Sequence, residues 1–222
     1  MSEKHAEKIK SNFDYNGKIF SNTPSMIIPS GRNIKEKFIL TKKEKIVIGM
    51  AASRISTFKG FDLTIKALAL LSSKYNLILE LVGEEINNYF RLLIKDLNLR
   101  ENVIFLGLLT PGEMNNFYRQ IDIFIVASKW EGLSTVMLEA MSFGIPVIST
   151  KVGEIPNFIK DGHNGLFFEN GNYKGLAQKI DLLIQNEGLY RNLSINSIDF
   201  SRNFYYENIV EKMIKNYKKV LR

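Results

Sequence analysis

The sequence predicts an α/β protein built on a doubly wound parallel sheet. Short segments that are apolar throughout alternate along the chain with longer segments whose apolar residues recur at helical spacing. Strands that are apolar on both faces are typical of a parallel sheet covered by helices, and helices of about ten to fifteen residues between them act as right-handed crossovers. The length of 222 residues and the hydrophobic fraction of 45% are sufficient for such a core.

The expected strands share one pattern, a short apolar run bounded by polar or turn residues. The first follows the charged segment that ends at Lys45, and the last is short and precedes the C-terminal helices. In chain order the predicted strands are 46–52 (IVIGMAA), 76–83 (NLILELVG), 102–107 (NVIFLG), 122–128 (DIFIVAS), 145–150 (IPVIST) and 165–169 (GLFFE).

The helices between these strands are predicted from helical apolar spacing and from their end signals. In chain order they are 60–74, 89–99, 110–120 and 134–144, followed by two or three C-terminal helices. The third carries the clearest start, because Thr110 can cap it, Pro111 suits the first turn and Glu113 completes a capping box. The fourth is expected to end at Gly144.

The charge balance argues against nucleic acid as a partner. Lys and Arg number 30 against 23 Asp and Glu, which gives a formal net charge of +7. The basic residues are spread along the chain with acids between them, a pattern typical of a solvated surface. Binding to nucleic acid stays an alternative that a steep salt dependence of duplex binding would support.

The chain contains no cysteine, which excludes a disulfide framework, a thiolate zinc site and a cysteine nucleophile. The polar N-terminus lacks the apolar run of a signal peptide, and no apolar stretch approaches the roughly 18 residues that cross a bilayer. We therefore expect a cytoplasmic protein.

The two ends of the chain differ from the regular middle. Residues 1–44 mix polar residues with a short apolar piece and are predicted to be a connector. The tail, 204–222, predicts an amphipathic helix with Lys212, Lys215 and Lys219 on its basic face. A helix docked on the domain is the simpler interpretation, and adsorption to anionic lipid at the inner face of a membrane is the alternative.

Two cations follow the first predicted strand, in the segment SRISTFKG. Ligands of doubly wound folds bind at the carboxyl ends of the strands, so the loops there are the first places to search. Arg54 and Lys59 are expected in one strand-to-helix loop, next to the positive end of the following helix. A planar guanidinium, an ammonium and helix N–H groups together suit a diphosphate, whereas two ordinary surface cations are the alternative.

The segment 129–150 (KWEGLSTVMLEAMSFGIPVIST) is the most unusual in the chain. Its helix is apolar on almost every face, yet Glu139 lies in its middle. A buried carboxylate needs a partner, so Glu139 either pairs with a core cation or accepts hydrogen bonds from a ligand such as a ribose diol. Eight residues earlier, Glu131 lies in the loop at the end of a strand, and Gly132 allows close approach of a ligand before Ser134 and Thr135 open the helix. An exposed loop acid is the alternative for Glu131.

With this basic loop and the two glutamates eight residues apart, the chain resembles the C-terminal domain of retaining glycosyltransferases of family 4. The resemblance runs from about Lys45 to the end and is most specific in EGLSTVMLEAMSFGIPVIST followed by KVGEIPNFIKDGHNGLFFE. It implies a Rossmann-like domain, the C-terminal half of the GT-B fold. Ser53 stands where the family usually has glycine before its arginine, a small departure that we expect to be tolerated.

The resemblance implies roles for individual residues. Arg54 and Lys59 would neutralise the diphosphate of a nucleotide-sugar donor, Thr135 would lie near its distal phosphate, and Glu139 would bind the ribose hydroxyls. The residues implied for the donor sugar are Glu131, Gly132, Leu133 and Ser134, and those implied for the base are Leu108 and Leu109.

The resemblance also implies that Glu131 is not a nucleophile, since the family is thought to transfer the sugar on the same face with help from the donor phosphate. The chain has no Asp-x-Asp motif and two histidines, His5 and His163. We therefore expect no cofactor and no metal.

The predicted organisation is a remnant of an N-terminal domain and linker over 1–44, followed over 45–222 by the nucleotide-sugar-binding domain with its C-terminal helices. The predicted function is transfer of a glycosyl group to a hydroxyl acceptor with retention, this chain supplying the donor-binding half. The acceptor would be a sugar or a lipid-linked molecule, and a separate chain could supply the missing domain. The alternatives are a non-catalytic nucleotide-sugar-binding subunit, a degenerate paralogue and, with less support, a GT-B sugar epimerase.

Overall fold

The structure, a computed structural model, describes residues 44–85, 88–205 and 214. The chain divides into two compact units, Asn33–Phe200 and a second unit of Met1–Arg32 with Ser201–Arg222. Of the second unit, 201–205 and 214 are described and include the short 3-10 helix Arg202–Phe204. The predicted connector, apart from Glu44, and most of the predicted amphipathic tail lie outside the described residues.

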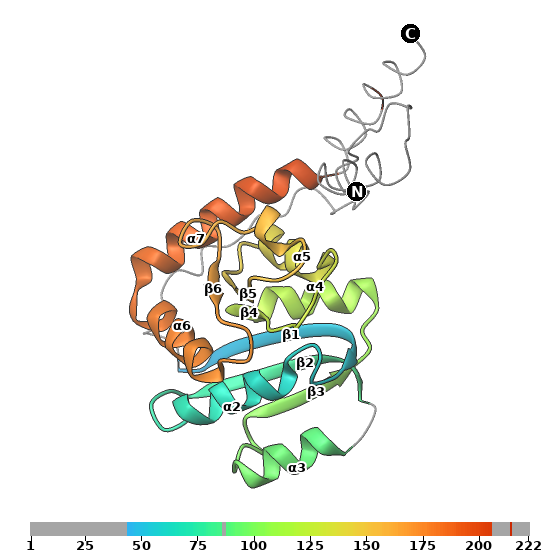
Figure 1. Cartoon of the computed structure of the whole chain (residues 1–222), viewed down its shortest axis with the longest axis vertical. Helices are drawn as coiled ribbons and strands as arrows, with labels where there is room; N and C mark the ends of the chain where they lie inside the picture. Colours follow the sequence, from blue (N-terminus) through green and yellow to red (C-terminus); the bar gives the residue numbers. More distant parts are fainter. Residues whose placement is uncertain (1–43, 86–87, 206–213, 215–222) are drawn as a thin grey trace, which may run out of the picture. The chain divides into compact units, whose positions relative to one another are not determined.

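The unit Asn33–Phe200 holds a six-stranded sheet in which all neighbouring strands are parallel, in the order β3-β2-β1-β4-β5-β6 (Figure 1). The strands are β1 (Ile46–Ile55), β2 (Leu77–Glu85), β3 (Val103–Gly107), β4 (Ile123–Val126), β5 (Val147–Thr150) and β6 (Leu166–Phe168). The prediction of a doubly wound parallel sheet is confirmed.

The helices cover both faces of the sheet. They are α2 (Phe61–Leu71), α3 (Tyr89–Asp96), α4 (Pro111–Gln120), α5 (Thr135–Ser142), α6 (Tyr173–Gln185) and α7 (Glu187–Ser201), and a 3-10 helix spans Ile155–Asn157. On one side α2 packs against α3 and α6, while α4 packs on β1 and α5 packs on β4 and β5 on the other (Figure 1). Strand residues such as Ile48, Leu79 and Ile148 are fully buried between these layers.

The local end signals act as predicted. The Thr110 side chain caps α4, Pro111 lies in its first turn and Glu113 completes the capping box. Helix α5 ends at Ser142, and Gly144 then adopts a φ of 69°, which glycine tolerates best. These signals depend on neighbours in the chain, so they can be read without knowledge of the tertiary fold.

Strand β1 is longer than predicted. An irregularity between Ala51 and Arg54 interrupts its pairing with β2, but the strand resumes with Arg54 opposite Glu84 and Ile55 opposite Glu85. Ile55 is fully buried, which explains why the chain stays extended to this point. The prediction that Arg54 lies in the strand-to-helix loop is therefore wrong, because Arg54 belongs to β1 itself.

Candidate functional site

The candidate site lies where β1 and β4 run side by side. The chain leaves β1 into α2 and leaves β4 into α5, and these two helices pack on opposite faces of the sheet. At such a switch point the connecting loops diverge and leave a crevice beyond the carboxyl ends of the two strands. The loop after β1 carries Lys59, and the loop after β4 carries Glu131.

Glycines allow the loops at this end of the sheet to pack closely. Gly60 has a φ of 74°, and a Cβ atom there would overlap the carbonyl oxygen of Ala127. Gly153, in the loop after β5, has a φ of 55°, and a Cβ atom there would overlap the carbonyl oxygen of Glu131. The Lys129 N–H also donates to the Phe58 carbonyl at 2.9 Å. The backbone that carries Glu131 is thus held from two sides.

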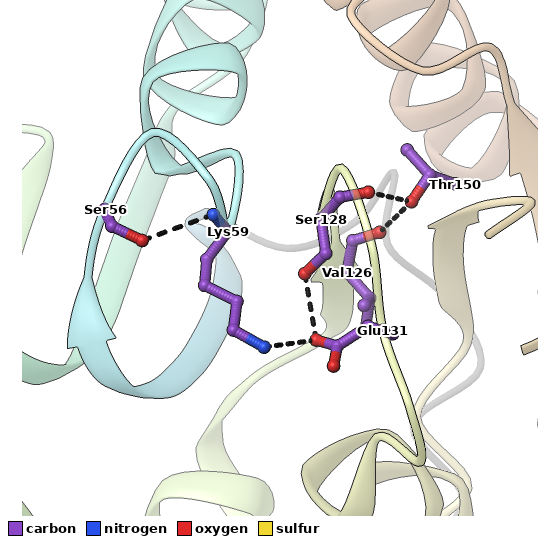
Figure 2. Close-up of polar contacts among 6 residues, drawn as sticks. All are labelled: Ser56, Lys59, Val126, Ser128, Glu131 and Thr150. Atoms are coloured by element: carbon purple, nitrogen blue, oxygen red, sulfur yellow. Dashed lines mark hydrogen bonds and ion pairs between the residues drawn. The ribbon is translucent and has the colours of Figure 1, made fainter. Parts of the chain in front are cut away.

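A short chain of polar contacts joins these loops (Figure 2). The Lys59 ammonium donates to Glu131 Oε1 at 2.7 Å, and the Ser128 hydroxyl donates to the same oxygen at 2.9 Å. The Thr150 hydroxyl, at the end of β5, donates to the Ser128 carbonyl at 2.7 Å. The Glu131 side chain is 12% exposed and that of Lys59 30% exposed. Glu131 is consequently not the exposed loop acid of the alternative interpretation.

Arg54 has a different environment. Its guanidinium lies 3.6 Å from the Glu84 carboxylate, and the two side chains are 72% and 57% exposed. The structure therefore brings Lys59 together with Glu131, while it pairs Arg54 with the end of β2.

Glu139 on α5 accepts a hydrogen bond from the Tyr118 hydroxyl on α4, at 2.7 Å to Oε2. Burial raises the pKa of the Glu139 carboxyl above its usual value, and the Tyr118 hydrogen bond opposes that shift. Burial, followed by the neighbouring carboxylate, raises the pKa of the Tyr118 hydroxyl. From the sequence, the expected partner of Glu139 was either a core cation or a ligand. The structure shows a partner that neither interpretation included, the neutral hydroxyl of Tyr118.

The remaining predicted residues lie around the start of α5 and after β3. Ser134 is the residue before the helix, but its side chain makes no capping hydrogen bond. Gly132 is half-buried, and a Cβ atom there would have the Trp130 ring as its nearest neighbour at 3.8 Å. Leu133 is half-buried, Thr135 and Leu108 are exposed and Leu109 is half-buried. Among the described residues, Gly132 thus has no close backbone neighbour of the kind found at Gly60 and Gly153.

Sequence reasoning missed three hydroxyl groups at the site, those of Tyr118, Ser128 and Thr150. Ser128 and Thr150 end two predicted apolar strands, and a polar residue at the carboxyl end of a parallel strand was the available signal. Tyr118 gave no comparable signal, because an aromatic residue in an amphipathic helix is an ordinary core residue.

The described residues show neither a cluster of metal ligands nor a membrane-spanning helix. Within 44–85, 88–205 and 214, no group of three or more histidine or acidic side chains is arranged to hold a metal ion. None of the helices in the described part of the chain combines the length and the hydropathy that a bilayer crossing requires.

Comparison with known families gives a match over most of the chain. Residues 32–200 match the family described as Glycosyl transferases group 1. An uncharacterised glycosyltransferase of Haemophilus influenzae is 28% identical over 204 residues, which cover 90% of this chain and 55% of that protein. N-acetyl-alpha-D-glucosaminyl L-malate synthase of Bacillus anthracis is 29% identical over 84% of this chain and 48% of its own length. The chain spans about half the length of these curated relatives.

Solved structures give the same fold. The C-terminal domain of the group 1 glycosyl transferase LpcC of Francisella tularensis is 28% identical, with a TM-score of 0.68, and the match covers 82% of this chain and 97% of that one. Anabaena HepE, solved in complex with UDP and glucose, is 25% identical with a TM-score of 0.72, over 79% of this chain and 49% of that one. TarM of S. aureus is 24% identical with a TM-score of 0.78 over 97% of this chain and 42% of that one, and shows the fold alone.

Proposed function

The chain belongs to the Glycosyl transferases group 1 family, and on that premise we propose that it supplies the donor-binding half of a retaining glycosyltransferase. It binds a nucleoside-diphosphate sugar, from which the glycosyl group passes to a hydroxyl acceptor. The observation that carries the proposal is the Lys59–Glu131 pair, held at 2.7 Å at the switch point between β1 and β4. HepE, a protein of similar fold, was solved with UDP and glucose, which supports a nucleotide-sugar donor.

In this proposal Lys59 and Arg54 stabilise the diphosphate. The leaving nucleoside diphosphate gains negative charge as the glycosidic bond breaks, and fixed cations are most effective where charge develops. Lys59 reaches it from the loop after β1, where Glu131 already holds the ammonium in place. Arg54, near the end of β1, exchanges its Glu84 partner for phosphate. Thr135, the first residue of α5, lies near the distal phosphate.

The donor sugar is held by Glu131 and the backbone that follows it, Gly132, Leu133 and Ser134. The Lys59 and Ser128 donors share Glu131 Oε1. Among the residues that the structure describes, none donates to the second carboxylate oxygen, which we assign to a sugar hydroxyl. A carboxylate held by an ammonium is a weak nucleophile. Glu131 is therefore assigned to binding, and transfer occurs on one face of the sugar with retention, assisted by the donor phosphate.

The nucleoside is held by Glu139 and by the loop after β3. Glu139 accepts hydrogen bonds from the ribose hydroxyls, and Leu108 and Leu109 contact the base. Exposed Leu108 and half-buried Leu109 offer apolar area at this end of the sheet. The chemistry that the side chains supply needs no metal, since Lys59, Arg54 and helix N–H groups carry the positive charge.

The acceptor is a hydroxyl of a sugar or of a lipid-linked molecule, bound with the help of a further domain in this chain's complete protein or in a separate chain. Peripheral contact with the inner face of a membrane would place the site near lipid-linked acceptors.

Isothermal titration of the full chain with UDP-glucose, GDP-mannose and ADP-glucose tests the proposal. We expect the chain to bind one of the three, and Lys59→Ala to weaken that binding roughly tenfold or more, because a hydrogen bond to a charged group contributes about 1.5–3 kcal/mol. The matched control is Lys66→Ala. Lys66 is also paired with an acid, Asp62 at 3.7 Å, but both residues belong to helix α2 and not to the loops of the candidate site. Absence of binding both by the chain and by the chain mixed with its acceptor-domain partner would overturn the proposal.

A further inference from the structure

Tyr118 and Glu139 form a contact between two helices that cover the same face of the sheet. The Tyr118 hydroxyl lies 2.7 Å from Glu139 Oε2, although the two residues are 21 positions apart in the chain. Tyr118 is 2% exposed, and its ring packs against those of Phe124 and Phe143 at centroid distances of 6.1 and 5.2 Å. This packing holds the ring, and with it the position of the hydroxyl oxygen.

The hydroxyl can donate one hydrogen, and the geometry decides where it goes. The Val136 carbonyl lies 3.4 Å from the Tyr118 oxygen, whereas Glu139 Oε2 lies at 2.7 Å, within the short range typical of a hydroxyl–carboxylate bond. Burial and the neighbouring carboxylate keep the proton on the tyrosine, since both raise its pKa. Oε2 is thus occupied.

The second oxygen, Oε1, accepts no hydrogen bond from the residues that the structure describes. It is also not among the buried polar atoms without a partner, which in the described part of the chain are Asp62 Oδ1 and Glu85 Oε1. Oε1 is therefore open to solvent on a carboxylate whose other oxygen is tied down. A carboxylate oxygen has two lone-pair sites, so Oε1 can accept from both hydroxyls of a vicinal diol.

We propose that Tyr118 is a positioning residue: its hydroxyl holds Glu139 Oε2 so that Oε1 faces the 2′- and 3′-hydroxyls of the nucleoside. This inference rests on the proposed function, because it takes the ribose as the diol that Glu139 meets. Tyr118 itself does not touch the nucleotide. Without the Tyr118 hydroxyl, the Glu139 side chain is no longer held in one position. Part of the binding energy of the nucleotide is then used to order the carboxylate when the ribose binds.

The test compares ribonucleotides with deoxyribonucleotides. The full chain and its Tyr118→Phe variant are titrated with UDP, 2′-deoxy-UDP and 3′-deoxy-UDP, or with the matching guanosine or adenosine set if that base is the one bound. Wild type is expected to prefer the ribonucleotide. Tyr118→Phe should weaken binding of the ribonucleotide roughly threefold to tenfold, the span of one hydrogen bond. It should weaken binding of each deoxynucleotide less, because each keeps only one of the two hydroxyls that Glu139 Oε1 would meet. A merely structural role would weaken all three alike.

The matched control is Tyr190→Phe. The Tyr190 hydroxyl is equally buried, at 3% exposure for the residue, and donates to the Asp122 carbonyl at 2.8 Å, next to the amino end of β4 and so away from the site. Thermal unfolding of both variants checks that they are folded, and Tyr190→Phe should retain the wild-type preference for ribose. In a Glu139→Gln background, Tyr118→Phe should cause no further change in that preference.

The outcomes separate the two proposals. If wild type binds no nucleoside diphosphate, the proposed function fails and this inference fails with it. If wild type binds but treats ribose and deoxyribose alike, the assignment of Glu139 to the ribose fails, and so does the role of Tyr118. If wild type prefers ribose and Tyr118→Phe keeps that preference, Tyr118 has no positioning role, while the proposed function stands.

Discussion

Among the cation–carboxylate pairs at the carboxyl end of the sheet, two flank β1, one on each side. Lys59 and Glu131 join the loops after β1 and β4 at 2.7 Å, with side chains 30% and 12% exposed. Arg54 and Glu84 join the ends of β1 and β2 at 3.6 Å, with side chains 72% and 57% exposed. Similar residue types at the same end of the same sheet thus produce two different environments.

The difference follows from topology. Strands β1 and β2 are joined by a crossover on one face, and beyond the irregularity between Ala51 and Arg54 their pairing resumes and extends to Ile55 and Glu85. Their ends therefore stay side by side, and the Arg54 and Glu84 side chains are exposed there. Strands β1 and β4 share a short pairing, and the chain beyond them turns to opposite faces. Loops rather than strand ends meet there, and the glycines at positions 60 and 153 let them approach closely enough to shield a charged pair. Burial, rather than residue type, distinguishes a candidate site from a surface ion pair.

The largest effect, a loss of stability, is expected from adding a side chain at Gly153, which packs against the Glu131 backbone. Gly153→Ala should lower the free energy of unfolding by roughly 2–5 kcal/mol, because the added Cβ overlaps the Glu131 carbonyl oxygen and the backbone is left-handed. The measurement is urea unfolding followed by circular dichroism. Gly171→Ala is the control, since Gly171 also has a positive φ, 82°, but has no atom within 4 Å of an added Cβ. Equal losses in the two variants would contradict the close packing described for the site.

The next effect separates the two cations in nucleotide binding. Lys59→Ala should weaken nucleoside-diphosphate binding roughly 10- to 100-fold, whereas Arg54→Ala should weaken it less than about tenfold, because an exposed charge is better screened by water and salt. Titration of both variants at low and high salt gives the ratio. A larger loss for Arg54→Ala would show that the arginine leaves Glu84 for a shielded position when the donor binds, and the contrast between the two pairs would then hold only without nucleotide.

The third effect concerns the pH dependence of stability. Burial raises the pKa of Glu139 above its usual 4.5, so the folded chain binds this proton more tightly than the unfolded chain. Stability from this group is then present below the unfolded pKa and is lost as pH rises through the folded pKa. Glu139→Gln should remove that loss and raise the free energy of unfolding at pH 7, while nucleotide binding weakens.

Its control is Glu80→Gln. Burial also raises the pKa of Glu80, which accepts a hydrogen bond from the Gln120 amide at 2.7 Å. This variant should share the gain in stability at pH 7 but leave nucleotide affinity unchanged. Thermal unfolding from pH 4 to pH 8 measures the first property and calorimetry the second. A decrease in stability for Glu139→Gln at pH 7 would contradict the direction of the pKa shift.

The smallest effect is expected from the exposed pair. Glu84→Gln should change the free energy of unfolding by less than about 0.5 kcal/mol, because an exposed ion pair gains little energy in water. Urea unfolding at low and at high salt measures it. A loss of more than about 1 kcal/mol would mean that the end of β2 is held by this pair, and the contrast with Lys59–Glu131 would disappear.

Much of the fold could be predicted because its signals are local. The alternation of strands and helices, the capping box at Thr110 and the end of α5 near Gly144 all depend on residues within a few positions of one another. Lys59 and Glu131 were also identified as candidates, since each follows an apolar strand. The error over Arg54 came from the same local reasoning, because the continued pairing of β1 with β2 depends on residues 30 positions away, such as Glu84.

The amino-acid sequence by itself determined the class of fold, the end of the sheet at which chemistry is to be sought, and the charged residues available there. The tertiary structure decided which of those residues meet. It pairs Lys59 with Glu131 across 72 positions and Tyr118 with Glu139 across 21, and it leaves Arg54 at an exposed strand end. The physical reason is that burial and hydrogen-bond geometry depend on contacts between segments that are distant in the chain. Strand order and the close packing of loops determine those contacts, and no local sequence pattern encodes them.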